Sequence, residues 1–328
     1  MADALASGAS DRKVVGVQVP PRAPETATSE SAYSCNRVES LDDKNIPVEF
    51  DAVLYRTRHA DLGHLTEEQL LEHYEAHGMD EGRCASAIES RVHFFSLIPE
   101  SSTALEIGPF NNPCVQGPNV RYFDTLSTDG LRRRATEIGI DQTRIPEIHY
   151  VDPNGDLSIV KEQFDYCVSS HAIEHQPDLV RHLVAVSNLL APGGRYMLAV
   201  PDRRYTFDHF IKDSNIAEVV EAHQQRRTVH TLQSVIEHRA LTTHNDPALH
   251  WQGEHGTSEI DPSRVLSAVE EFEKTEGYLD VHAWLFTPKS FRLVIDALSS
   301  LGLIAMTIER IFPTLRGSNE FYSVLRQI

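Results

Sequence analysis

The chain has 328 residues, with 30 Lys and Arg against 48 Asp and Glu, so its formal net charge at pH 7 is −18. This length accommodates about two domains, and 41% hydrophobic and 24% charged residues are typical of a globular protein with a sizeable core. The acidic excess argues against nucleic-acid partners, which need Lys and Arg patches, and no apolar run approaches the ~18 residues of a membrane span.

The first 46 residues are rich in Ala, Ser, Thr and Pro, which predicts a disordered tail. Residues 15–24 resemble accidentally translated non-coding sequence, so we expect the true start of the protein near residue 46. No signal-peptide pattern opens the chain, and its four cysteines, Cys35, Cys84, Cys114 and Cys167, form no CxxC pair. We therefore expect a reducing compartment and a cytoplasmic location.

Residues 47–86 have a compact helical pattern. Phe50 and Tyr55 belong to a first helix, and Thr66 followed by Gln69 predicts a capping box at the start of a second. Gly78 is a typical helix stop. The run LLEHYEAHGMDEGR at residues 70–83 resembles a small helical module found beside bacterial glycan-biosynthesis enzymes, which implies a protein partner for residues 47–86. The plainer alternative is a helical hairpin that packs on the next domain.

From residue 87 onward, predicted strands alternate with predicted helices. The helices are expected at about 86–98, 128–138, 177–190, 214–240 and 288–300, and the strands at 103–107, 120–123, 148–151, 164–169, 195–200, 303–311 and 319–327. Such alternation predicts an α/β fold in which helices cover both faces of a mostly parallel sheet. The expected domains are a tail (1–46), a helical module (47–86) and one large domain (87–328) with an insertion at 202–287.

Acidic residues and a glycine stand where the first two of these strands end. Gly108 directly follows the first strand, where a glycine lets the backbone turn tightly and approach a ligand. Glu106 precedes it, and Asp124 ends the second strand, where its carboxylate is placed to accept hydrogen bonds from ribose hydroxyls. Because only one glycine of a GxGxxG loop is present, the pattern suits a cofactor without a pyrophosphate and disfavours a nicotinamide dehydrogenase.

From about residue 88 to the end, the chain resembles the class I S-adenosylmethionine-dependent methyltransferases. The matching segments are EIGPF (106–110, with Phe110 in place of the family's second glycine), Asp124, Asp152, SSHAIEH (169–175) and LAPGG (190–194). The resemblance implies a Rossmann-like, seven-stranded, mostly parallel sheet and S-adenosyl-L-methionine as cofactor. It places the cofactor against Glu106, Gly108, Pro109, Phe110, Asp124, Asp152, Ser170 and His171, with Leu157 beside the adenine ring.

Several of these residues have a structural alternative. Glu106 could cap the loop that follows it, and Asp152 could cap a helix. Glu174 and His175 begin a predicted helix, where a carboxylate is favoured by the helix dipole, so a structural role is expected for both.

The insertion at 202–287 is expected to be a lid that covers the site and shapes the acceptor pocket. The candidate general bases are His171, Asp202 and His209, with Tyr205 as an orienting group. The insertion is rich in histidine, but His238, His244, His250 and His255 lack the HxxxH or HxH spacing of a preformed site, so no metal is predicted.

The resemblance implies an enzyme of class EC 2.1.1 that moves a methyl group by in-line displacement to a small-molecule or glycan acceptor, for instance a hydroxyl. The segment VPDRRYTFDHF at residues 200–210 is shared with a bacterial branch often found near cell-surface glycan genes. The alternative is a non-catalytic cofactor-binding or scaffold partner in a glycan-assembly complex.

Overall fold

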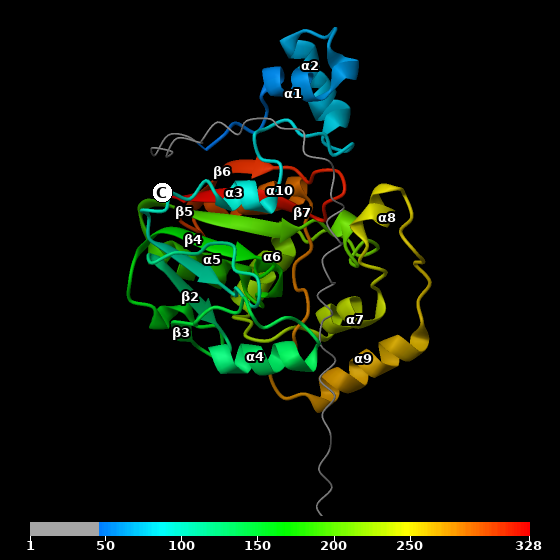
Figure 1. Ribbon diagram of the computed structural model, residues 1–328. Helices are drawn as coiled ribbons and strands as arrows, with labels where there is room; N and C mark the ends of the chain where they lie inside the picture. Colours follow the sequence, from blue (N-terminus) through cyan, green and yellow to red (C-terminus); the bar gives the residue numbers. More distant parts are fainter. Residues whose placement is uncertain (1–45) are drawn as a thin grey trace, which may run out of the picture.

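A computed structural model describes residues 46–328 of the chain (Figure 1). The predicted tail and the predicted downstream start lie outside the described residues, apart from Ile46. None of the described helices is both long and apolar enough to cross a bilayer.

Seven strands form one sheet in the order β3-β2-β1-β4-β5-β7-β6. Their bounds are β1 Ala104–Ile107, β2 Val120–Asp124, β3 Tyr150–Val151, β4 Phe164–Ser170, β5 Leu190–Pro201, β6 Met306–Phe312 and β7 Glu320–Gln327. Strands β1 to β5 are parallel, and β7 runs antiparallel to both of its neighbours. The predicted α/β fold with a mostly parallel, seven-stranded sheet is therefore confirmed.

Helices cover both faces of the sheet. One face packs against α5 (Leu179–Leu189), α6 (Ile216–Gln224) and α10 (Pro288–Ser300) through buried residues such as Leu183, Val219 and Phe291. On the other face, Phe94 of α3 (Arg91–Phe95) stacks on Tyr322 of β7 at a centroid distance of 4.9 Å. α4 (Thr128–Glu137) packs through a smaller cluster around Leu131.

The N-terminal helices α1 (Ala52–Arg58) and α2 (Glu67–His73) lie apart from the sheet in Figure 1. A short turn, η1 (Ala60–Leu62), joins them, and a π-helical segment, η2 (Tyr74–Gly78), follows. Tyr55, Leu70 and Tyr74 form their buried core. The predicted capping box is present, since Thr66 accepts from the backbone N–H of Gln69 and the Gln69 side chain accepts in return.

The two edge strands of the sheet differ in length and in what lies beside them. β3 has two residues, and the other edge strand, β6, meets the segment that precedes α1. There Glu49 accepts a hydrogen bond from the backbone N–H of Ile311 at 2.5 Å, and the Arg310 side chain donates to the carbonyl of Pro47 at 3.2 Å. The first described residues thus lie along β6.

Three sequence predictions need correction. The single helix expected at 214–240 is two helices, α6 and α7 (Leu232–Ala240), because Arg226 between them has a φ of 51° that no α-helix accommodates. The helix expected at 86–98 shortens to α3, where Ser90 caps the start. The strand expected at 195–200 begins earlier, at Leu190, and residues 191–194 are an irregularity in its pairing with β4 before the register resumes at Arg195.

The remaining helices of the insertion lie beside the end of the sheet at which β5 ends (Figure 1). They are η5 (Arg203–Tyr205), α7, α8 (Pro247–Trp251) and α9 (Pro262–Lys274). α8 and α9 both start with an Asp cap followed by proline, a combination that favours a helix N-terminus.

Candidate functional site

The predicted cofactor residues lie side by side at the carboxyl edge of the sheet. Ile107 is level with Phe123 of β2 and Ser169 of β4, so Gly108, Asp124 and Ser170 follow at neighbouring strand ends. Asp124 is level with Val151, which places Asp152 next along the edge. The strand order reverses at β1, and ligands of open α/β sheets bind at such a point. We call this set, Glu106, Gly108, Pro109, Phe110, Asp124, Asp152, Ser170 and His171, the strand-end site.

Glu106 holds the loop that follows β1. Its side chain is 1% exposed and accepts hydrogen bonds from the backbone N–H groups of Cys114, at 2.8 and 3.0 Å, and Val115, at 3.2 Å. Burial raises the pKa of Glu106 to about 7, although these donors favour its charged form. This is the loop-capping role that the sequence left open, and contact with a cofactor remains a prediction.

The turn after β1 uses left-handed backbone at two positions. Gly108 has a φ of 70°, and a Cβ added there would meet only the Cβ of Ala172, at 3.7 Å. Phe110 has a φ of 41°, a conformation that costs a residue with a side chain about 1 kcal/mol or more. Phe110 therefore has a backbone conformation that glycine adopts without strain, while its ring packs near Leu131.

Asp124 combines burial with a free carboxylate oxygen. It is 8% exposed, and its Oδ1 accepts from the backbone N–H of Leu126 at 3.0 Å. Within residues 46–328, no hydrogen bond reaches its Oδ2. Burial raises the pKa of Asp124 above its ordinary value. One oxygen thus fixes the turn after β2, and the other can accept from a ligand hydroxyl.

Asp152 and Leu157 have local roles. Oδ1 of Asp152 accepts from the backbone N–H groups of Asn154 and Asp156, at 2.8 and 3.0 Å, so it holds a turn and not the helix cap left open by the sequence. Leu157 is 3% exposed and belongs to the main core cluster. Their contact with an adenine ring remains a prediction.

His171 joins the strand-end site to β7. It has a φ of 51°, and its Nε2 lies 2.8 Å from Oε2 of Glu320, the first residue of β7. Arg91 of α3 also pairs with Glu320, its Nε donating at 2.9 Å. Although burial opposes it, the hydrogen bond from His171 and the charge of Arg91 lower the pKa of Glu320 well below its usual range. Sequence reasoning missed Glu320 and Arg91, because no local motif marks them.

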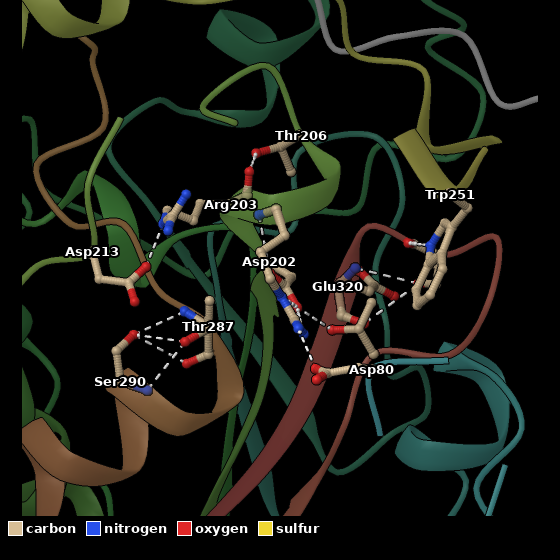
Figure 2. A network of polar contacts seen from close by, with 12 residues as sticks. Asp80, Asp202, Arg203, Thr206, Asp213, Trp251, Thr287, Ser290 and Glu320 are labelled. Carbon is tan, nitrogen blue, oxygen red and sulfur yellow. Dashed lines mark hydrogen bonds and ion pairs between the residues drawn. The ribbon is translucent and has the colours of Figure 1, made fainter. Parts of the chain in front are cut away.

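Asp202 lies at the centre of the polar network in Figure 2. It is fully buried and accepts from Arg204 (Nη2 at 2.7 Å, Nε at 3.0 and 3.2 Å) and from the Thr314 hydroxyl at 2.7 Å. Arg204 extends the network to Asp80 of the N-terminal module, at 3.2 Å. Because both oxygens of Asp202 have partners, it could act as a general base only after losing one of them.

Tyr205 and His209 are held in ring stacks. Tyr205 stacks on Trp251 at a centroid distance of 3.9 Å and an angle of 9°, and burial raises the pKa of Tyr205 to about 12. Nδ1 of His209 lies 2.7 Å from the carbonyl of Arg204, and its ring stacks on His255 at 3.7 Å. Of the four predicted catalytic residues, His171 lies at the strand ends, and the other three lie in or beside η5.

The structure gathers ligand-type side chains that the sequence did not connect. Among residues 46–328, three groups bring one ligand atom from each of their residues within 4.8 Å of one another: His209–His250–His255, Glu174–His175–His282 and Asp208–His238–His282. His282 lies beyond the histidine-rich stretch. Only the fold could reveal the last two groups, since their members lie far apart in sequence.

A cavity of about 390 Å³ lies elsewhere, between α3 and the loop after β1. Phe95, Cys114 and Arg144 line it, together with Ala104 and Val120 at the amino ends of β1 and β2. It therefore lies away from the carboxyl edge of the sheet.

No family model matches the chain, and a search of curated proteins found no match. Solved structures that resemble it include mitomycin 7-O-methyltransferase MmcR (13% identity, 82% of this chain, 60% of that chain, TM-score 0.36). Another is an S-adenosylmethionine-dependent methyltransferase from Mesorhizobium loti (15% identity, 72% of this chain, 96% of that chain, TM-score 0.36). A third is a proposed Zn-dependent alcohol dehydrogenase from Rhodobacter sphaeroides (13% identity, 73% of this chain, 89% of that chain, TM-score 0.39). Similarity at this level does not assign a function to the chain.

Proposed function

We propose that the protein is an S-adenosylmethionine-dependent methyltransferase that acts on a small-molecule or glycan acceptor. The observation that carries the proposal is the buried carboxylate of Asp124, whose Oδ2 is free at the end of β2 beside the left-handed turn at Gly108. A carboxylate at this place suits a ribose hydroxyl, and the turn lets the backbone approach the same ligand. The resemblance in motif order supports the same cofactor.

The cofactor supplies a methyl group on a sulfonium, which is already an activated leaving group. The task of the chain is therefore to align the acceptor with that methyl and to exclude water. In this proposal Asp124 holds the ribose, Glu106 keeps the loop after β1 in place, and His171 faces the reacting end. His171 is the candidate base because its side chain lies at the strand ends and is one-third exposed. Its Nε2 pairs with Glu320, just as Asp202, Tyr205 and His209 have partners of their own.

Calorimetric titration with S-adenosylhomocysteine tests this function. We expect Asp124→Ala to weaken binding at least about tenfold, because a hydrogen bond to a charged carboxylate contributes about 1.5–3 kcal/mol. The matched control is Asp129→Ala on α4, whose side chain is 78% exposed and which should leave the affinity unchanged. Absence of binding by the unaltered protein, or equal affinity in both variants, would contradict the proposal.

The hydrogen bonds and ring contacts of these candidate catalytic residues also favour the non-catalytic alternative. With Asp202 and Tyr205 engaged, the chain could bind the cofactor without turning it over. Labelled S-adenosylmethionine incubated with an extract of the native organism separates the two functions. A labelled small molecule or glycan supports the enzyme, and cofactor binding without any labelled product supports the scaffold.

A further inference from the structure

Glu174, His175 and His282 meet in the interior between the strand-end site and the insertion. Glu174 and His175 come from the short turn η4 (Ile173–His175) after β4, and His282 comes from the segment that links α9 to α10. Glu174 is 1% exposed and His282 8%. A carboxylate oxygen and two imidazole nitrogens, one from each residue, lie within 4.8 Å of one another.

The carboxylate of Glu174 has no hydrogen-bond partner within the described chain. Both of its oxygens are buried, and neither accepts a hydrogen bond. A buried charged group without a partner is costly, and buried carboxylates in proteins are normally paired or bound to a metal. Nδ1 of His171 and Nε2 of His175 lie 3.9 and 3.8 Å from Oε1 of Glu174, too far for a hydrogen bond, so the carboxylate still lacks a donor or an ion in direct contact.

Carboxylates behind the two histidines orient their rings. Nδ1 of His282 lies within hydrogen-bond distance of Oδ2 of Asp208, at 2.7 Å. Nδ1 of His175 lies 3.0 Å from Oδ1 of Asp280, an ion-pair distance at which the two groups are not aligned for a hydrogen bond. With a hydrogen on each Nδ1, the Nε2 atoms keep free lone pairs. Nε2 of His175 is 3.8 Å from Oε1 of Glu174, close to the ~3.4 Å between neighbouring ligands that each lie about 2.1 Å from a tetrahedral ion. Carboxylate–histidine–metal arrangements are built in this way.

The backbone holds the two segments together. The N–H groups of Ala283 and Trp284 both donate to the carbonyl of Glu174, at 2.7 and 3.2 Å. The indole of Trp284 also donates to the carbonyl of Gln176, at 2.6 Å. These main-chain contacts therefore hold the segment with Glu174 and His175 beside the segment with His282.

We propose that Glu174, His175 and His282 bind a divalent transition-metal ion, with Asp280 and Asp208 orienting the two histidines. Two imidazoles and one carboxylate suit Zn²⁺, Mn²⁺ or Fe²⁺. The rings of His175 and His282 meet edge to face, with their centroids 4.8 Å apart and an angle of 84° between their planes. In the group around His250, by contrast, the His209 and His255 rings lie parallel, at 11°, and a 3.0 Å contact between Nδ1 atoms joins His250 to His255.

The ion would lie beside the strand-end site, since Nδ1 of His171 is 3.9 Å from Oε1 of Glu174. If the chain is a methyltransferase, as proposed above, an ion at this place favours acceptors whose oxygen atoms can bind it, such as a vicinal diol. Metal binding itself does not depend on methyl transfer, and it is tested separately.

The test is metal content after loading. The full chain is incubated with Zn²⁺ or Mn²⁺, dialysed and measured by inductively coupled plasma mass spectrometry. We expect about one ion per chain for the unaltered protein, and loss of that ion in Glu174→Gln and His282→Ala. Asp280→Asn, which removes the charge beside His175 and also the charge that faces Arg134, should weaken metal affinity by roughly 10–100-fold.

His255→Ala is the matched control, because it removes a histidine of the stacked group and should retain the ion. Circular dichroism checks that each variant is folded. X-ray absorption of the Zn²⁺-loaded unaltered protein gives a readout without mutation and should show imidazole and carboxylate ligands. The proposal would be overturned if no ion is bound after loading. It would also be overturned if His255→Ala loses the ion while His282→Ala retains it. Glu174 would then be a partner of a protonated His175.

Discussion

Glu320 is a buried carboxylate with three hydrogen-bonding neighbours, His171, Arg91 and Tyr322, of which Arg91 also forms an ion pair with it. It is 5% exposed and lies at the start of β7, level with Pro201 of β5. These contacts tie α3, the loop after β4 and β7 to one side chain. The ionised state of Glu320 is therefore part of what holds the strand-end site in shape.

Acid should weaken the fold through this residue. His171 and Arg91 outweigh burial and lower the pKa of Glu320 in the folded chain, whereas an unfolded Glu titrates at about 4.3. A lowered carboxylate pKa stabilises the fold above the unfolded pKa, and this contribution is lost as the pH falls from about 5 toward the folded value. We expect Glu320→Gln to reduce the loss of unfolding free energy between pH 5 and pH 3 by about 1 kcal/mol or more.

Urea unfolding at several pH values measures this effect. The control is Glu276→Gln, which changes an exposed carboxylate and should keep the pH dependence of the unaltered protein. If both variants lose stability in acid as the unaltered chain does, Glu320 does not carry the effect.

At the scale of single elements, α2 offers a clean test of local stability. Thr66 and Gln69 satisfy two backbone N–H groups at its start, and both side chains face solvent. Thr66→Ala removes the cap without opening a cavity, so we expect a loss of about 1 kcal/mol in the unfolding free energy of the N-terminal helices. Hydrogen exchange of residues 67–74 should report it. Glu72→Ala, on the exposed side of the same helix, should change exchange far less.

The sequence predicted elements well where one local signal dominated. Thr287 and Pro288 mark the start of α10, and buried apolar runs mark β1 and β4. The prediction was wrong at 214–240 because the polar and apolar spacing is nearly continuous, whereas the break depends on one left-handed residue, Arg226. It was incomplete at β5, where the pairing of Leu190 with Phe164 of β4 starts the strand ahead of Gly193.

The residues of the candidate site could also be predicted only where a local signal marks them. Gly108, Asp124 and Asp152 could be found because each directly follows or ends a strand of a parallel sheet, and such ends meet at one edge. Glu320 and His282 could not, because their partners arise from antiparallel pairing and from a long insertion. Contacts between distant segments depend on the packing of the whole chain and leave no local pattern.

At the scale of the whole molecule, Gly82 is where the N-terminal module meets the rest of the chain. Its carbonyl accepts from the backbone N–H of Arg316 at 3.0 Å, and its φ is 66°. A Cβ there would lie 2.5 Å from that nitrogen and 2.6 Å from the Trp251 ring. Trp251 in turn stacks on Tyr205, so this contact joins the module to the insertion.

Gly82→Ala should therefore separate the module from the insertion. The clash and the left-handed backbone together predict a loss of about 2–4 kcal/mol from this contact. Limited proteolysis should cut faster within residues 46–86 of the variant. Gly63→Ala is the control, because Gly63 has a φ of −58° and the nearest atom to an added Cβ is 3.4 Å away. Equal cleavage in the two variants would show that the module does not depend on Gly82.

The edges of the sheet have a consequence for how the protein behaves among its own copies. An exposed edge strand is a template on which a second chain can add a strand, and long open edges promote aggregation. Here one edge offers the two residues of β3, and along the other the N–H of Ile311 is already bonded to Glu49. The segment before α1 thus occupies part of the β6 edge, and β3 offers a strand of only two residues, so both edges give a second chain little length on which to pair.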